Sequence, residues 1–156
     1  MVENVDPSVD ELWNAVGTVE TAAGSETRIP KDDEHWNQLR AHALRLVEIG
    51  NLLRIPGRRA VPADGTVPGA HIAGVLDHDE IAKAVANEWS RFQTYAHDFQ
   101  VAAQGALRAT RKHDAHALFE AGERLQEACE QCHVHFWYPG DRPPPDPAAS
   151  DVVPIN

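Results

Sequence analysis

The chain has 156 residues with a hydrophobic fraction of 42%, which is enough for a single globular domain. Its 24 acidic residues outnumber its 14 Lys and Arg residues, so the formal net charge is −10. Because no basic cluster could neutralise phosphates, nucleic acid and anionic membranes are poor partners. No apolar run approaches the roughly 20 residues of a membrane span, and the N-terminus lacks the features of a signal peptide. We expect a cytoplasmic protein or an exported one without its signal.

Helical spacing of apolar residues dominates the first half of the chain, and the sequence predicts an all-α fold. A first helix is expected from Ser8 to Val19. The following stretch, "GTVETAAGSETRI", is too short and too interrupted by Gly and Ala to predict strands. A second helix should begin at a cap on Asp32 or Asp33 and end at Pro56-Gly57. Residues 58–76 have no period and are expected to form a long loop.

The second half carries the strongest helical periodicity. Ile81 to Arg111 is too long for an average helix, so we expect a break between Ala86 and Glu88. Residues 112–114 should form a tight turn before a last helix that starts at about Asp114 and stops at Tyr138-Pro139-Gly140. Two short connections and one long one predict a four-helix bundle over residues 1–140. Residues 141–156 form a Pro-rich tail that we expect to be extended.

The two cysteines of the chain, Cys129 and Cys132, lie near the end of this last helix and are followed directly by His133. A thioredoxin-like pair would sit at a helix N-terminus, where the helix dipole lowers the thiol pKa. A haem-free helical module that binds zinc through these three residues and His135 is an alternative, but four ligands within one helix converge poorly on a tetrahedral ion. C-x-x-C-H is the signal for covalent haem.

Helical spacing supports the haem interpretation. Cys129 and Cys132 are one turn apart on one face, so both sulfurs can bond the two vinyl groups of one porphyrin as haem c. His133 follows Cys129 by four residues, so it shares that face and is the predicted axial ligand of the iron. With both thiols used, no free cysteine would remain.

The segment "DAHALFEAGERLQEACEQCHVHFWYP" resembles the class II c-type cytochromes, the cytochrome c′ family, in which haem is attached near the end of the fourth helix. The resemblance extends over roughly Pro7 to Pro139 and is most specific in the last sixty residues or so. It implies a periplasmic haem protein that moves electrons or binds small gases. It also implies haem packing by aromatic and apolar residues of the last two helices, for which the candidates are Trp89, Phe92, Phe99, Leu125 and Phe136.

The chain departs from this family in two ways. Many members place Arg or Lys near a haem propionate soon after the haem histidine, whereas this chain has Trp137 and Tyr138, so propionate partners are expected elsewhere. Low-spin members take a sixth ligand, a methionine, from the first helix. The candidates here are Met1, the single methionine of the chain, and His42, on the apolar stripe of the second helix.

The occupant of the sixth position decides the function. A side chain there predicts an electron carrier, our first interpretation, whereas a vacant position predicts a five-coordinate protein that binds NO or CO. Neither is an enzyme, and the sequence shows no catalytic arrangement. Haem attachment in bacteria takes place outside the cytoplasmic membrane, so we expect a periplasmic protein. The acidic composition predicts a redox partner with a basic docking patch. Such bundles also dimerise through their first two helices, so Trp13 and Trp36 are candidates for a dimer interface or for the core.

Overall fold

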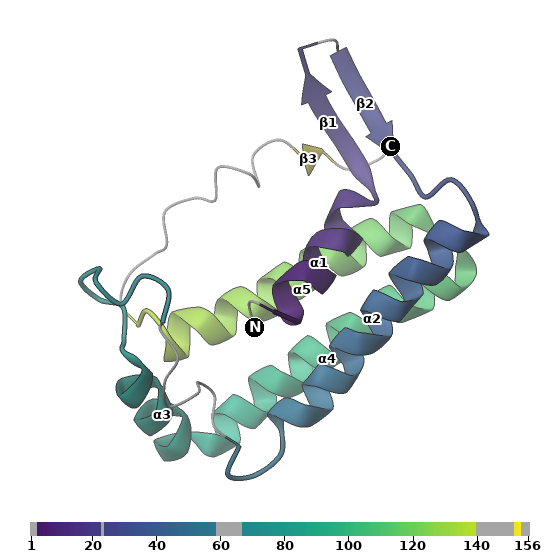
Figure 1. The fold of residues 1–156 in the computed structure, drawn as a ribbon. Helices are drawn as coiled ribbons and strands as arrows, with labels where there is room; N and C mark the ends of the chain where they lie inside the picture. The colour runs from purple at the N-terminus through teal and green to yellow at the C-terminus, as the bar shows by residue number, and fades with distance from the viewer. Residues whose placement is uncertain (1–2, 23, 59–66, 140–151, 154–156) are drawn as a thin grey trace.

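The computed structural model describes residues 3–22, 24–58, 67–139 and 152–153. Most of these residues are helical (Figure 1). In chain order the elements are α1 (Val5–Asn14), β1 (Gly17–Thr21), β2 (Gly24–Arg28), α2 (Asp33–Leu53), α3 (His78–Asn87), α4 (Trp89–Lys112), α5 (Ala115–Phe136) and β3 (Val152–Val153).

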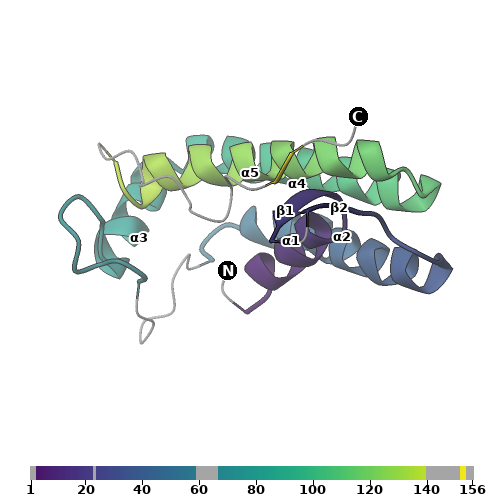
Figure 2. The ribbon, with the colours of Figure 1, turned by 90° about the horizontal axis from the view of Figure 1, so that it is seen from above.

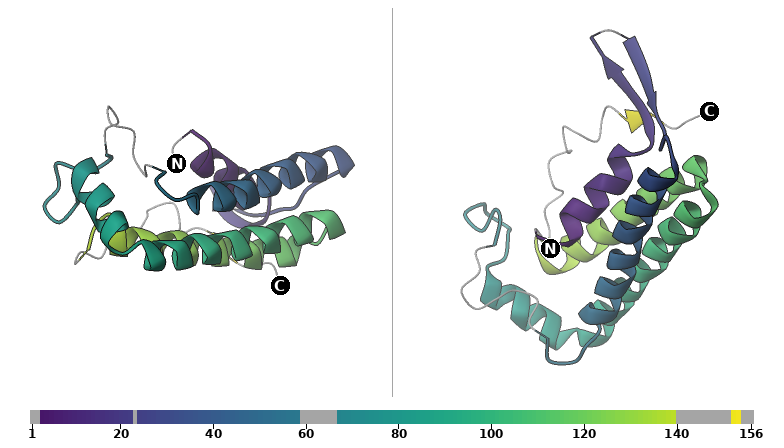
Figure 3. Two further views of the ribbon diagram at one scale, coloured as in Figure 1. Left: turned by 90° about the horizontal axis from the view of Figure 1, so that it is seen from below. Right: turned by 45° about the vertical axis from the view of Figure 1, so that its right-hand side comes forward.

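Two layers of helices enclose the main core. The helices α4 and α5 lie side by side in one layer, and α1 and α2 form the layer packed against them (Figures 2 and 3). The short helix α3 lies across the end of the bundle where α4 begins and α5 ends (Figure 1). The largest fully buried apolar side chains of the main core lie on α1, α2 and α5, and they are Leu12, Leu39, Leu46, Leu118 and Leu125. The helix α4 contributes mainly alanines to this core.

Aspartate caps fix the starts of the long helices and confirm several predicted boundaries. The Asp32 carboxylate accepts from the backbone N–H of His35 at 2.8 Å, so α2 starts where the sequence predicts. A capping box between Asp77 and Glu80 opens α3. The predicted break is confirmed, because α3 ends at Asn87 and α4 begins at Trp89.

A β-hairpin corrects the all-α prediction. Strands β1 and β2 pair antiparallel from Gly17–Arg28 to Thr21–Gly24, and β3 adds to the free edge of β1. The strands β1 and β2 lie in the stretch "GTVETAAGSETRI", for which no strands were predicted. Gly17 and Gly24 adopt φ values of 121° and 122°, which only glycine tolerates readily. The interrupting glycines therefore shape the hairpin, which projects from the helical layers (Figure 3).

The first helix also differs from its prediction, since it covers Val5–Asn14 where Ser8 to Val19 was expected. Pro7 lies inside the first turn, where its missing N–H has no helical partner to lose. The helix ends early because residues from Gly17 onward enter β1. With α3 counted separately, the described chain has five helices where four were predicted.

The two candidate interface tryptophans have different environments. Trp36 is buried in the main core and its ring stacks on His113 at 5.1 Å. Trp13 is 36% exposed, and its indole N–H donates to the carbonyl of Gly122 at 3.1 Å. Trp36 is therefore a core residue, whereas Trp13 anchors α1 on α5.

The remaining predictions concern the ends of the chain and the membrane. No helix among the described residues is both long and apolar enough to span a bilayer. Of the predicted tail, only the two residues of β3 belong to the described part of the structure. The prediction for the other residues of 141–156 lies outside it.

Candidate functional site around Cys129, Cys132 and His133

The C-x-x-C-H motif lies in the last two turns of α5, where the bundle's two apolar clusters meet. Cys129 and Cys132 are both half-buried free thiols. Cys129 packs against the main core. Cys132 packs against a second cluster, built around Ile81 and Val85 of α3, Phe92 of α4 and Phe136 of α5. One helical face therefore presents both sulfurs at the boundary between two apolar regions.

Burial keeps both thiols protonated. It raises the pKa of Cys129 to about 12, and the negative charges of Cys132, Asp6 and Glu130 add to the effect. The pKa of Cys132 rises to about 11 for the same main reason. A redox-active pair needs a lowered thiol pKa, so the geometry argues against thioredoxin-like chemistry.

The His133 side chain is half-buried beside two aromatic rings. Burial lowers its imidazole pKa, although the charges of Glu130 and Asp6 act in the opposite direction. Its ring meets Trp137 edge to face at 5.0 Å and lies 6.2 Å from Tyr138. The imidazole is therefore favoured in its neutral form, which is the form that binds metals.

The end of α5 is held by hydrogen bonds on both sides of the motif. The Tyr138 hydroxyl donates to the Glu130 carboxylate at 2.9 Å, which ties the turn after the helix to the residue that follows Cys129. The backbone N–H of Leu76 donates to the Trp137 carbonyl at 2.8 Å and attaches the loop before α3 to the same turn. Among the described residues, the buried Trp137 indole N–H has no acceptor.

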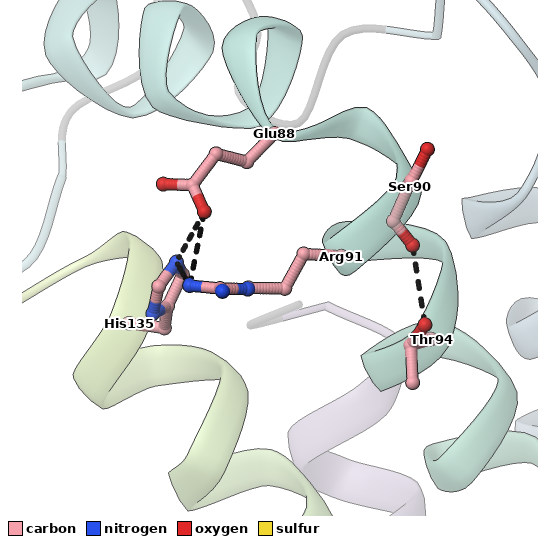
Figure 4. Close-up of polar contacts among 5 residues, drawn as sticks. All are labelled: Glu88, Ser90, Arg91, Thr94 and His135. Atoms are coloured by element: carbon pink, nitrogen blue, oxygen red, sulfur yellow. Dashed lines mark hydrogen bonds and ion pairs between the residues drawn. The ribbon is translucent and has the colours of Figure 1, made fainter.

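His135 points to the opposite side of the helix from His133. Its Nε2 lies 3.2 Å from a Glu88 carboxylate oxygen and 3.3 Å from Arg91 Nη1, and Arg91 bonds the same Glu88 oxygen at 3.0 Å (Figure 4). This cluster joins the α3–α4 break to the end of α5. In the described part of the chain, no three His, Cys, Asp or Glu side chains are placed to share a metal ion. The four residues of the zinc alternative are not assembled.

The predicted haem-packing residues divide between the two clusters. Trp89, Phe92 and Phe136 lie in or against the second cluster with Cys132, where the Phe92 ring is 5.6 Å from both other aromatic rings. Phe99 and Leu125 lie in the main core on the side of Cys129.

Sequence reasoning missed Tyr95, whose ring meets Phe136 edge to face at 6.0 Å. It also missed Ile81 and Val85 as part of this site. The position of Tyr95, three residues after Phe92 on α4, was the signal that could have found it.

Of the two candidate sixth ligands, only His42 belongs to the described part of the structure. Met1 lies outside the described residues. His42 is half-buried between α1 and α2, with Nδ1 3.3 Å from the Ser8 hydroxyl and 3.5 Å from Arg45 Nη1. Arg45 also donates to the Ser8 hydroxyl, at 3.2 Å. The described contacts of His42 are with these two polar groups, and none joins it to the cysteines or to His133.

A groove of about 300 Å³ runs along the outer seam of α4 and α5. Its walls carry both charges, with Asp98 and Arg108 on α4 and Arg124 and Glu127 on α5. Ala128 and Gln131 line it, whereas the two cysteines and His133 do not. This groove is therefore separate from the motif.

Comparison with known proteins adds no relationship: no family model matches the sequence, and searches of curated proteins and of solved structures found no significant match.

Proposed function

We propose that the protein is a c-type cytochrome that carries one haem through thioethers to Cys129 and Cys132, with His133 as the axial ligand. The observation that carries this proposal is the arrangement at the end of α5. Two thiols one turn apart and a half-buried imidazole share a helix end at the junction of two apolar clusters. Thioether attachment consumes two thiols, and axial ligation requires a neutral imidazole.

The chain's own residues fit such a group chemically. The apolar residues beside Cys132 and Cys129 can exclude water from the porphyrin, and burial favours the neutral imidazole that ligation needs. The Trp137 N–H is a buried hydrogen-bond donor without an acceptor among the described residues. When bound, the haem supplies a one-electron couple and, where a coordination position is open, a site for a diatomic gas.

The first functional interpretation is electron transfer in the periplasm with an oppositely charged partner. The chain carries a net charge of −10, and Asp6 and Glu130 lie close enough to the motif to influence Cys129 and His133. An acidic surface near a redox centre favours a partner with a basic docking patch, whose association slows as salt screens the attraction.

Gas binding is the second candidate, and the position of His42 favours it. The described contacts of His42 are with Ser8 and Arg45 in the α1–α2 interface. An imidazole engaged there is a poor source of a sixth ligand. On this interpretation the reduced protein binds CO or NO at an open position.

The test is maturation in a host that attaches haem c, followed by intact mass and optical spectra. We expect the mass of the chain plus one haem, and an unaltered mass would overturn the proposal. The variant His133→Ala should lose the wild-type axial spectrum, whereas His135→Ala, on the other side of the same helix, should retain it. Equal effects of the two variants would contradict the assignment of His133.

Carbon monoxide then separates the two functions. On the gas-binding interpretation the reduced protein binds CO, and His42→Ala leaves the resting spectrum unchanged. A reduced protein that ignores CO until His42 is removed would instead be a bis-histidine electron carrier.

A further inference from the structure

The indole N–H of Trp137 stands out among the buried polar groups of the described chain. It is buried without a hydrogen-bond acceptor, and it is the single side-chain atom of the described residues in that state. Trp13 shows the usual arrangement, since its N–H donates to the Gly122 carbonyl. A buried donor without a partner destabilises a fold, so this one calls for an acceptor that the described residues do not supply.

Several contacts fix the Trp137 ring in place. Its backbone N–H donates to the His133 carbonyl at 2.8 Å, and its own carbonyl accepts from Leu76 at 2.8 Å. The ring meets the His133 imidazole edge to face and packs against the second apolar cluster, as does Cys132. Because both its backbone and its ring are held, the indole cannot turn to solvent without breaking these contacts.

The position of the donor narrows the chemistry of its acceptor. The ring touches the predicted axial ligand and shares a cluster with one of the two attachment cysteines. A haem bound there has two groups able to accept a hydrogen bond at its edge, and both are propionate carboxylates. The turn after His133 contains no Lys or Arg, and Arg91, across on α4, is already paired with Glu88 and His135.

We propose that the Trp137 indole N–H donates a hydrogen bond to a propionate of the haem and so replaces the cation that would otherwise bind that carboxylate. This inference rests on the proposed function. It revises the expectation that propionate partners lie elsewhere in the chain. Hydrogen bonds to a charged acceptor are stronger than neutral ones, so the bond would stabilise the haem-loaded chain selectively.

The test compares Trp137→Phe with Trp36→Phe, the same substitution in the main core, where Trp36 stacks on His113. Both retain an aromatic ring, and only the first removes the unpaired N–H. In the haem-loaded protein, Trp137→Phe should shift the propionate bending band of the resonance Raman spectrum, and Trp36→Phe should leave it in place. In 15N-tryptophan-labelled protein, exchange of the Trp137 indole proton should slow by about tenfold or more on haem attachment, as a charge-assisted bond predicts.

The outcomes separate this inference from the proposed function. A wild-type chain that gains no haem mass overturns both. A haem-loaded chain in which Trp137→Phe leaves the propionate band unchanged overturns the inference alone, as does an indole proton that exchanges equally fast with and without haem.

Urea unfolding separates the proposed bond from the packing of the ring. Trp137→Phe should lower the midpoint more in the haem-loaded protein than in the haem-free chain, because the proposed bond forms only when haem is attached. An equal change in the two forms would also overturn the inference.

Discussion

The two thiols of the haem-free chain should be almost inert to alkylation while the chain is folded. Iodoacetamide reacts with the thiolate, whose fraction at pH 8 is about 0.1 for a thiol of pKa near 9. Burial raises the pKa of Cys129 from 9.0 to about 12 and that of Cys132 from 9.0 to about 11. The thiolate fraction then falls by about 1000-fold for Cys129 and about 100-fold for Cys132.

The assay is carbamidomethylation of the haem-free protein, followed by peptide fragmentation that reads the two positions separately. The same chain in urea is the reference, since both thiols are solvated there and should react at ordinary rates. Between pH 7 and 10 each folded-state rate should rise about tenfold per pH unit, because the thiolate fraction does. Folded protein that reacts as fast as unfolded protein at pH 8 would refute the assigned burial.

The variant Asp6→Asn tests whether burial or nearby negative charge contributes more to the raised pKa of Cys129. Asp6→Asn removes one of the negative charges that raise the pKa of Cys129, whereas burial is the cause that acts on Cys132. Cys129 should then react a few-fold faster and Cys132 at its wild-type rate, with Cys129 still far slower than in urea. A Cys129 rate that reaches the unfolded value would show that charge, and not burial, protects it.

Two further predictions concern the stability of the haem-free chain. Burial lowers the His133 pKa below 6.5, so the unfolded chain binds the proton more readily. Stability from this group is therefore present above pH 6.5 and is lost as pH falls below it, and His133→Gln should flatten the acid side of a plot of melting temperature against pH. Gly50→Ala should lower the free energy of unfolding by about 1–3 kcal/mol, because its Cβ would lie 2.7 Å from Gln100 Cβ and 3.2 Å from Gln100 Cα. In Gly105→Ala the new Cβ would lie 3.7 Å from the Ala121 Cβ, which is an ordinary contact distance. This variant should instead raise the free energy of unfolding by up to about 1 kcal/mol, as measured by urea titration.

The long helices could be predicted because their signals are local. Apolar stripes and aspartate caps at Asp32, Asp77 and Asp114 depend on residues within a turn or two of each other. The hairpin gave no such signal. Strand β2 is exposed along most of its length, and β1 changes steadily from a buried Gly17 to an exposed Thr21, so neither has the alternating burial that predicts a strand. Gly17 and Gly24 were read as interruptions, although their positive φ values shape the turns.

The candidate site also has a part that local sequence predicts and a part that it does not. The relation of Cys129, Cys132 and His133 depends on one helix, so spacing alone predicts it. Helical spacing of about 100° per residue also separates His135 from His133, and their contacts on different sides of α5 agree with it. What surrounds the motif depends on segments more than 30 residues distant, which no local pattern encodes.

The short helix α3 gives the motif its environment. In a plain four-helix bundle Phe136 would pack on Phe92 and Tyr95 of α4 alone, and the side that α3 covers would be open to water. Here Ile81 and Val85 of α3 pack with Phe136 in the second cluster. The Glu88–His135 pair then joins the α3–α4 break to α5 from its far side.

The loop before α3 closes the same end of the bundle. Leu76 bonds the Trp137 carbonyl and packs against the second cluster, so this segment holds the turn that follows the motif. This end of the bundle covers Cys132, whereas Cys129 packs against the main core. Haem should therefore reach Cys132 before α3 and its loop dock on α5, because the folded haem-free chain shields this thiol from solvent.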